Sequence, residues 1–371
     1  MEKFEDRVLI SGIGISRIAR RSGRTGMEHA LEASLGAIGD AGLNIKDIDG
    51  IASIGDVAVD SLQDALGLKV EWTGGGGSGA QLSAVFSGCL AVAAGLCRHV
   101  LVYRSVEMMG GEPPAGRALG WTEWLLPFGA YSAAHWLAMN AQRHMHLYGT
   151  TKEQLGWIAM TCRAHAALND LAAYRAPLTM EQYLDCRPMT DPFGLLDCDA
   201  PVDGAVAVVV SRSDHIQDCP NGGVRVAAVG CAVRGRPSWD QGADYPATGA
   251  AGAAAQLWSR TDIRPTDVDV AELYDGFTFL VLDWLEALQF CAMGESGPFV
   301  EGGRRISLGG DLPLNTYGGQ LSAGRMHGYW LLHEACLQLR HQAGGRQVDG
   351  AEVAVASVGG GPYAGCVLLT R

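Results

Sequence analysis

The feature that most constrains the fold is a pattern of segments that occurs twice along the chain. Each half opens on an apolar run, at residues 8–15 and 224–231, and continues into a segment of helical spacing or small residues. A short acidic turn then leads into a second apolar run, at residues 47–54 and 267–274. Strands that alternate with helices are typical of parallel sheets covered by helices. The sequence therefore predicts a duplicated α/β fold.

The pattern continues to the end of each half. A helix of small residues precedes a buried strand at residues 79–103 and again at residues 328–356. Several turn formers at residues 217–223 indicate the join. We predict an N-terminal half at residues 1–220 and a C-terminal half at residues 221–371, because a chain of this length suits two units of roughly 150 to 200 residues.

An insertion interrupts the first half between residues 110 and 200. Thr150 and Glu153 have capping-box spacing, which predicts a helix from there to about Asn169. We expect the insertion to wall a pocket rather than to build the core, because it carries many aromatic and histidine residues: Trp121, Trp124, Phe128, Tyr131, His135, Trp136, His144 and His146.

Charge, apolar tracts and cysteine spacing exclude several classes of protein. The formal net charge is −12 without a basic cluster, which argues against broad nucleic-acid binding. The longest apolar tract, residues 90–103, is broken by Arg98 and His99, so we expect no membrane span. The charged start lacks the apolar region of a signal peptide. The 10 cysteines lack C-x-x-C spacing, which favours reduced thiols in a cytoplasmic protein over a disulfide framework or a zinc site.

Cofactor motifs are incomplete. The stretch from Gly12 to Gly14 lacks the third glycine of a dinucleotide fingerprint. No Lys-Ser/Thr pair follows residues 74–79 to make a P-loop. His144 and His146 are two residues apart and do not share a helix face. We therefore expect no tightly bound cofactor and no metal.

Four segments combine glycines with polar groups at the ends of predicted strands or the starts of helices. The first lies before a helix, whose exposed N–H groups favour an anion or a thioester oxygen. Each segment alone fits an ordinary turn in a chain with 51 glycines. Together and in this order they indicate one site: residues 74–80, 272–277, 315–328 and 357–363.

These segments resemble the thiolase superfamily, in particular its lipid-transfer-protein-type members, over nearly the whole chain. Residues 191–205 are similar to the stretch that closes the first half in that subgroup. Residues 315–324 resemble the Asn-x-x-Gly-Gly…Gly-His-Pro loop, and residues 357–361 the terminal Cys-x-Gly-Gly-Gly. The resemblance implies a five-layer αβαβα thiolase fold with an inserted helical loop domain, usually a dimer, that binds acyl-coenzyme A.

The chain departs from that family at the catalytic positions. The nucleophilic cysteine position falls at Ser78 or a neighbouring glycine, and the Gly-His-Pro histidine is Arg325. Ser357 replaces the acid–base cysteine, and Tyr274 replaces an Asn or His. Claisen condensation or thiolysis needs a thiolate and a second base. Because both are missing, we do not expect that chemistry.

A retro-aldol cleavage needs no covalent nucleophile and uses the same stabilised enolate oxygen. The chain is most similar to the cysteine-less steroid side-chain aldolases. That resemblance implies cleavage of a steroid or bile-acid β-hydroxyacyl-CoA to a ketosteroid and a short acyl-CoA. It also implies a homodimer core with a small OB-fold, often zinc-ribbon, partner subunit in a heterotetramer. Coenzyme A enters only as part of substrate and product. The expected oxygen-binding residues are Ser78, Gly318, Gly319, Ser357, Gly359, Gly360 and Gly361.

Tyr274 is the first candidate for proton transfer, because its position matches a catalytic position of the family. Asp275 either orients Tyr274 or only caps the next helix. The alternative for Tyr274 is a buried tyrosine whose hydroxyl is satisfied elsewhere.

Other polar side chains are candidates with open alternatives. His327 either titrates near neutral pH as an acid or base, or makes a structural hydrogen bond. Arg325 anchors a coenzyme A phosphate or holds a tyrosine as phenolate. Tyr363 or Tyr329 supplies a second phenol, unless Tyr363 packs on the rim. Which residue is the base and which the acid stays open.

Two rival functions remain from the sequence. One is a working thiolase or acyltransferase, and the other is a catalytically silent thiolase-fold scaffold for a partner. The aromatic insertion fits a sterol-binding wall, a helix packed on its own domain, or the partner face.

Overall fold

The computed structural model describes residues 3–75, 81–109, 121–130, 132–233 and 248–371. Within them, both halves of the chain share one nine-stranded sheet of order β3-β2-β4-β7-β1-β8-β11-β10-β9. The first half supplies β1 (Val8–Ile15), β2 (Gly50–Ser53), β3 (Trp72–Gly75), β4 (His99–Glu107) and β7 (Asp203–Arg212). The second half supplies β8 (Val224–Val233), β9 (Val270–Glu272), β10 (Val353–Gly359) and β11 (Tyr363–Thr370).

The strand order of the two halves is mirrored about their first strands. β1 and β8 meet in the middle, where Leu9 pairs with Arg225. The last strand of each half, β7 or β11, lies directly outside its first strand. The correspondence includes the outer edges of the sheet. Leu314 forms a parallel bridge with Ala271 on the outer side of β9, at the place that β3 occupies in the first half. This arrangement confirms the predicted duplicated α/β fold. The expectation of a parallel sheet was wrong in part, because only β2 with β3 and β4, and β9 with β10, pair in parallel, whereas the pairs formed by β1, β7, β8 and β11 are antiparallel. The residue boundaries of the halves stay a prediction.

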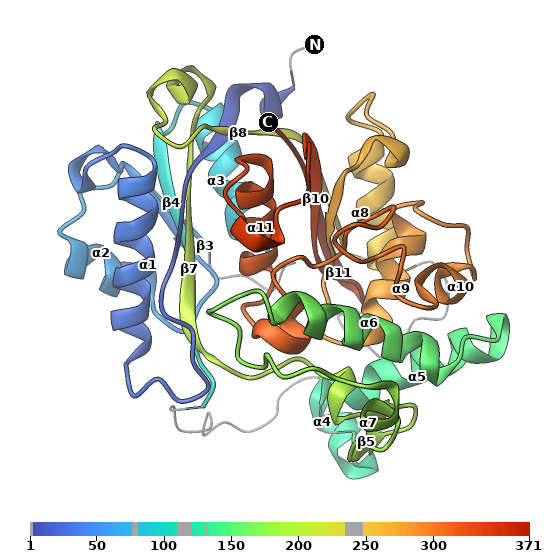
Figure 1. Cartoon of the computed structure of the whole chain (residues 1–371). Helices are drawn as coiled ribbons and strands as arrows, with labels where there is room; N and C mark the ends of the chain where they lie inside the picture. The colour runs from blue at the N-terminus through green and yellow to red at the C-terminus, as the bar shows by residue number, and fades with distance from the viewer. Residues whose placement is uncertain (1–2, 76–80, 110–120, 131, 234–247) are drawn as a thin grey trace.

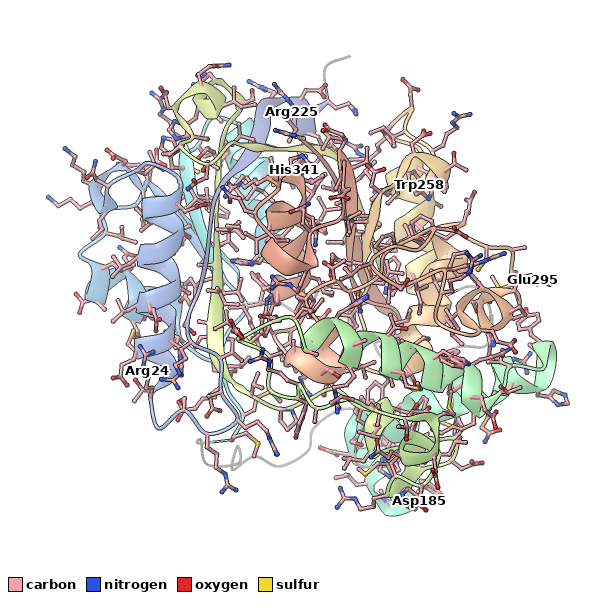
Figure 2. All side chains as sticks on the ribbon, viewed as in Figure 1. Arg24, Asp185, Arg225, Trp258, Glu295 and His341 are labelled. Carbon is pink, nitrogen blue, oxygen red and sulfur yellow. The ribbon has the colours of Figure 1, made fainter. Side chains whose placement is uncertain are left out.

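The strands of the first half and the strands of the second half make up two parts of the sheet, and helices form three layers around these parts (Figure 1). α1 (Gly26–Asp40) and α2 (Val59–Leu66) cover the outer face of the first part, and α8 (Gly249–Trp258) and α9 (Thr278–Ala287) that of the second. α3 (Ser83–Ala93) and α11 (Tyr329–Leu339) form the middle layer. α11 packs on β9 and β10 and also on β1 and β7. Its buried side chains fill the space between the two parts of the sheet (Figure 2).

Glycines occupy corresponding positions in the first strand of each half, because each of these strands lies very close to a helix. A Cβ at Gly14 in β1 would lie 2.1 Å from the carbonyl oxygen of Ala33 in α1. A Cβ at Gly230 in β8 would lie 2.0 Å from the carbonyl oxygen of Ala253 in α8. Only glycine permits such approaches. Gly14 therefore has a packing role, which accounts for it without a nucleotide.

The inserted region lies between β4 and β7 and gathers at one end of the molecule (Figure 1). Its described elements are α4 (Trp121–Leu125), α5 (Ala133–Tyr148), α6 (Lys152–Ala166), α7 (Met180–Leu184), β5 (Pro188–Thr190) and β6 (Phe193–Gly194). The N-cap of α6 is Thr151, paired with Gln154 in a capping box. The predicted box of Thr150 and Glu153 was therefore wrong by one residue, and the helix ends three residues before Asn169.

The second half also contains the short helix α10 (Ser296–Val300) and a π-helical turn, η7 (Gly319–Ala323). No helix among the described residues combines the length and apolar character needed to cross a bilayer.

Candidate active site

The carboxyl end of β9 and the middle of β10 bring two of the predicted residues together. The strands pair in parallel, with Ala356 opposite Glu272. Tyr274 follows β9, and its main-chain N–H donates a 2.9 Å hydrogen bond to the hydroxyl of Ser357. Both residues are buried. Ser357 therefore fixes the chain at Tyr274.

The loop that begins at Asn315 is fastened to the same strand end. Asn315 Oδ1 accepts a 2.7 Å hydrogen bond from the N–H of Leu273, and its Nδ2 donates to the Leu273 carbonyl at 2.9 Å. Asn315 has φ +49°, in the left-handed region that asparagine tolerates better than most residues. The side chain of Asn315 thus substitutes for a strand partner at this point.

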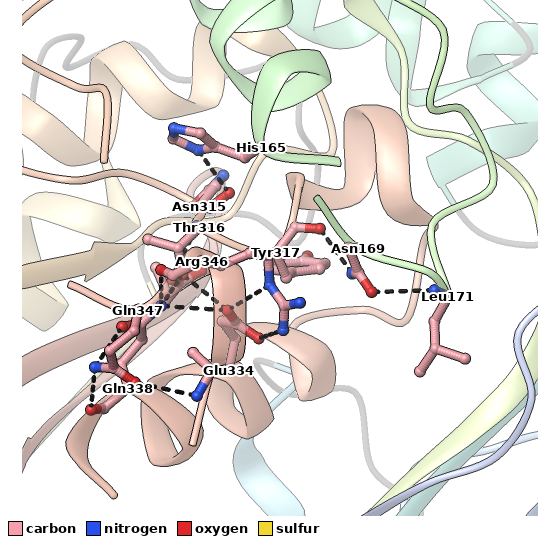
Figure 3. Close-up of polar contacts among 12 residues, drawn as sticks. His165, Asn169, Leu171, Asn315, Thr316, Tyr317, Glu334, Gln338, Arg346 and Gln347 are labelled. Atoms are coloured by element: carbon pink, nitrogen blue, oxygen red, sulfur yellow. Dashed lines mark hydrogen bonds and ion pairs between the residues drawn. The ribbon is translucent and has the colours of Figure 1, made fainter. Parts of the chain in front are cut away.

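A buried network lies beneath the loop (Figure 3). Glu272 accepts hydrogen bonds from the N–H and the hydroxyl of Thr316 at 3.0 and 2.7 Å. Glu334 accepts from Arg346 Nε and Nη2 at 3.1 and 3.0 Å. Burial and the nearby charge of Glu334 raise the pKa of Glu272 well above its usual range. The network therefore holds the loop on a buried carboxyl group, whose uncharged form is favoured by burial, and on the ion pair of Glu334 with Arg346.

Asp275 supports the next turn of the loop. Its carboxylate accepts hydrogen bonds from the N–H groups of Gln320 and Leu321 at 2.9 and 3.3 Å. Burial raises the pKa of Asp275 to about 7. Asp275 thus caps η7, rather than the helix α9 that follows it in sequence. An orienting role toward Tyr274 stays a prediction.

The two glycines of the loop are required by its geometry. Gly319 has φ +62°, and a Cβ there would lie 1.9 Å from Oδ2 of Asp275. Gly318 has φ +109°, and a Cβ would lie 2.5 Å from the Cβ of Ala166. The N–H of Gly318 already donates to Asn315 at 2.9 Å. Their predicted binding of a thioester oxygen stays untested.

The hydroxyl of Tyr274 lies in a polar environment formed by both halves. Burial, followed by the charge of Asp199, raises the pKa of Tyr274, whereas Arg325 and the side chain of Gln320 oppose the shift. The phenol is therefore protonated at neutral pH. In this state Tyr274 is a proton donor.

His327 lies between two arginines. Its Nε2 is 2.8 Å from Nε of Arg325, and its Nδ1 is 2.6 Å from Nη2 of Arg104. Burial and both guanidinium charges lower the pKa of His327 well below its usual value. A neutral imidazole accepts at only one nitrogen, so the ring is crowded by donors. The expectation that His327 titrates near neutral pH does not fit this setting, and its role stays a prediction.

Arg104 comes from the first half of the chain and contacts His327, which lies in the second half. It lies on β4 and also donates to the carbonyl of Ile54 after β2. A cavity of about 820 Å³ opens beside it, between the ends of β2 and β3 and the start of α2. Its walls include Ser53, Gly75 and Asp60. The cavity therefore reaches the residue that contacts His327.

Asp199 completes the polar group around Tyr274. Its Oδ1 lies 3.5 Å from Nη1 of Arg325, and its N–H donates to the carbonyl of Gly276 at 3.1 Å. Burial raises the pKa of Asp199 to about 6, against the charge of Arg325. Asp199 lies within the sequence motif at residues 191–205, but nothing local in that motif marks it as a site residue.

The other predicted residues that the structure describes lie at the junction of β10 and β11. Ser78 lies outside the described residues. Gly359 and Gly360 have φ +72° and +140° and form the turn from β10 to β11. Tyr363 opens β11, is half-buried, and pairs with Val233. The roles of these residues, and of Gly361, stay predictions.

Two buried cysteines near the helices of the site do not form a thiolate. Burial raises the pKa of Cys89 in α3 to about 12. The thiol of Cys162 donates a hydrogen bond of 3.7 Å to Asp275. Burial and the charge of Asp275 raise the pKa of this thiol well above its usual value. A thiolate is the reactive form of cysteine, so neither residue is prepared for acyl transfer.

Comparison with known proteins gives relatives along the whole chain. The family described as thiolase C-terminal domain-like matches residues 234–369. A steroid side-chain-cleaving aldolase of Thermomonospora curvata is 35% identical, over 97% of each chain. The 17-hydroxy-3-oxo-4-pregnene-20-carboxyl-CoA lyase of Mycobacterium tuberculosis is 34% identical, over 97% of this chain and 98% of that protein.

Solved structures show the same fold. The Ltp2-ChsH2(DUF35) aldolase has a TM-score of 0.92 and 32% identity, and the match covers 99% of this chain and 98% of that one. Human mitochondrial 3-ketoacyl-CoA thiolase has a TM-score of 0.72 at 14% identity, over 100% and 99% of the chains. At 14% identity, the similarity to the human thiolase shows a shared fold and nothing more.

Proposed function

Because the chain belongs to the thiolase superfamily, among its steroid side-chain-cleaving aldolases, we propose that it cleaves a β-hydroxyacyl-CoA by a retro-aldol reaction. The relatives at 34–35% identity over 97% of the chain confirm the resemblance inferred from the sequence. The substrate is a steroid or bile-acid side-chain thioester, and the products are a ketosteroid and a short acyl-CoA.

The observation that carries this proposal is the make-up of the site around Tyr274. Tyr274 is buried, and the charges of Asp199 and Arg325 both act on the pKa of its phenol, at a place where the superfamily uses thiols and a histidine. These groups can move protons but cannot carry an acyl group. Retro-aldol cleavage needs only proton transfers and a stabilised enolate.

The assembly is part of the proposal. The similar aldolase of known structure is named after two proteins, Ltp2 and ChsH2, which supports a partner subunit for this chain as well. We place a homodimer of this chain at the centre of a heterotetramer with a small OB-fold partner, often carrying a zinc ribbon. Light scattering after size-exclusion chromatography of the co-expressed proteins measures this composition directly.

The remaining properties follow from the same chemistry. The proposed proton transfers use only side chains of the protein, so the proposal includes no tightly bound cofactor, and coenzyme A enters with the substrate. A cytoplasmic location is consistent with the reduced cysteines.

The test is an assay of the co-expressed complex on a steroid β-hydroxyacyl-CoA. Mass spectrometry should detect a ketosteroid and a shorter acyl-CoA in equal amounts, without added free coenzyme A. A requirement for free coenzyme A, or an acylated cysteine, would instead indicate a thiolase. Unchanged activity of the complex after Tyr274→Phe would instead indicate a silent scaffold.

A further inference from the structure

Three aspartates lie in or beside the segment from Tyr274 to Thr278: Asp197 and Asp275, which are buried, and Asp199, which is partly exposed. They differ in how many hydrogen bonds their carboxylate oxygens already accept. Asp197 accepts from the hydroxyl of Thr278 at 2.7 Å, from the N–H of Gly194 at 2.7 Å, and from Lys152 and Tyr183. Its oxygens are therefore occupied by structural donors.

Asp275 is occupied in a similar way. Two main-chain N–H groups of η7, at Gln320 and Leu321, donate to its carboxylate, and the thiol of Cys162 contacts it at 3.7 Å. A substrate proton would have to compete with these donors. Asp275 is thus a support of the loop.

Asp199 has a different environment. Within the described part of the chain, its carboxylate has one side-chain partner, Arg325, at 3.5 Å. Its side chain keeps 13% of its surface exposed, so it is open on one side. The backbone around Asp199 is nevertheless fixed, because its N–H donates to Gly276 and the next N–H donates to Gln320. Asp199 therefore presents unused oxygens from a rigid position.

The neighbours of Asp199 cannot take a proton themselves. The guanidinium of Arg325 has only hydrogen-bond donors and no acceptor, and it occupies the place where the superfamily has a histidine. His327 faces a guanidinium at each ring nitrogen. Tyr274 is already protonated, for the reasons given above. A base for this reaction has to come from another residue.

We propose that Asp199 is the general base of the cleavage, that Arg325 positions it, and that Tyr274 is the acid. This assignment rests on the retro-aldol function proposed above. Asp199 takes the proton of the β-hydroxyl group, and the C–O bond becomes a carbonyl. The electrons of the Cα–Cβ bond pass into the thioester enolate, whose α-carbon then takes the proton of Tyr274.

The cycle closes without a further reactant. After cleavage Asp199 is protonated and Tyr274 is a phenolate, and transfer of one proton from Asp199 to Tyr274 restores both. The two residues are held near one another, because the N–H of Asp199 donates to the carbonyl of Gly276 at 3.1 Å, and a Cβ at Gly276 would lie 3.5 Å from the hydroxyl of Tyr274. Burial raises the pKa of Asp199 to about 6, so at neutral pH it is mostly ionised and still a useful base.

The direct test is Asp199→Asn in the co-expressed complex. The amide keeps the shape but cannot accept a proton, so kcat should fall about 100-fold or more, with KM and product acyl-CoA binding changed little. The wild-type kcat/KM should decrease below about pH 6, following the pKa of Asp199, and the residual activity of the variant should lack this decrease. Asp311→Asn is the matched control, because Asp311 is an exposed aspartate paired with Arg305 at 3.8 Å.

A second variant keeps the test decisive if Asp199→Asn folds poorly. The charge of Arg325 lowers the pKa of Asp199, so Arg325→Gln should move the acidic decrease of kcat/KM to higher pH. The groups that face Asp199 and enter this profile are Arg325, Tyr274 and Cys198. A purely structural arginine would lower activity without moving the profile.

The outcomes separate the two proposals. If Asp199→Asn cleaves substrate within about threefold of wild type, or if Arg325→Gln leaves the pH profile in place, Asp199 is not the base while the retro-aldol function stands. If the wild-type complex cleaves no β-hydroxyacyl-CoA, the proposed function fails, and the assignment of Asp199 fails with it.

Discussion

The main-chain N–H of Tyr274 donates a hydrogen bond of 2.9 Å to the hydroxyl of Ser357. The two residues lie 83 positions apart in the sequence and meet because β9 and β10 pair in parallel. At Ser357, which the sequence resemblance aligns with an acid–base cysteine of thiolases, this chain thus has a hydroxyl that accepts a hydrogen bond from the backbone. The change replaces a reactive group by one that fixes the backbone of the proposed acid.

Tyr274→Phe tests the role of the phenol. We expect kcat on a β-hydroxyacyl-CoA to fall by about 100-fold or more, because that is the scale of a lost general acid. The melting temperature should change little, since the backbone hydrogen bond to Ser357 does not involve the ring. Steady-state kinetics and thermal unfolding of the complex measure both effects.

Tyr317→Phe is the matched control for that variant. Tyr317 is fully buried on the neighbouring loop that begins at Asn315, and its hydroxyl has no hydrogen-bond partner among the described residues. Removing an unsatisfied buried hydroxyl should leave stability unchanged or slightly higher. A similar loss of activity in both variants would mean that Tyr274 acts through packing.

Gly319→Ala should damage both stability and activity. A methyl group there would lie 1.9 Å from Oδ2 of Asp275, at φ +62°. The carboxylate would have to leave the N–H groups of η7, so we expect a cost of at least about 1 to 3 kcal/mol and loss of turnover. Urea unfolding and kinetics measure these effects.

Gly39→Ala is the control for Gly319→Ala, because it is also a glycine-to-alanine substitution. Gly39 lies in α1 with no atom within 4 Å of an added Cβ, and alanine favours a helix by roughly 0.5 to 1 kcal/mol. This variant should be equally or more stable. Equal behaviour of the two variants would contradict a special requirement for glycine in the loop.

Arg346→Met should be strongly destabilising. Its partner Glu334 is fully buried, and the two side chains pair at 3.0 Å. Without the arginine, the buried charge of Glu334 remains beside Glu272, which typically costs about 3 to 5 kcal/mol. The free energy of unfolding in urea measures this cost.

The double variant Arg346→Met with Glu334→Gln should recover part of the loss, because no charge is then buried. Arg371→Met removes an exposed partner of Glu352 at 3.5 Å and should cost at most about 1 kcal/mol. A cost for Arg346→Met as small as that of Arg371→Met would show that the network does not hold the loop.

The duplicated fold could be predicted because its signals are local. β4 is buried at its first five positions, and such a strand gives a continuous apolar run. The start of α6 was harder, because Thr150 with Glu153 and Thr151 with Gln154 both have capping-box spacing. The structure uses the second pair, and the sequence alone does not separate them.

The candidate site could be predicted only in part. Tyr274 and the loop glycines were found through motifs, whereas Arg104 lies inside an apolar strand and meets His327 across 223 positions. Burial, followed by the charges of Arg104 and Arg325, lowers the pKa of His327, so its behaviour could not be inferred from its own segment. Asp199 was missed for a similar reason, because its partners Arg325 and Gly276 come from the other half.

Asp283→Asn should stabilise the protein increasingly as the pH rises. Asp283 is buried in α9 and accepts a 3.2 Å hydrogen bond from Thr248, and burial raises its pKa from the ordinary 3.8 to about 8. The folded state therefore binds this proton more tightly than the unfolded state, and the stabilisation present below about pH 4 is lost as the pH rises to about 8. Asparagine carries no charge in this range, so the advantage of the variant should grow between these values and then level off at several kcal/mol, since one pKa unit corresponds to about 1.4 kcal/mol. Urea unfolding of both proteins from pH 5 to 9 measures the difference, and a constant difference would show that Asp283 does not titrate in this way.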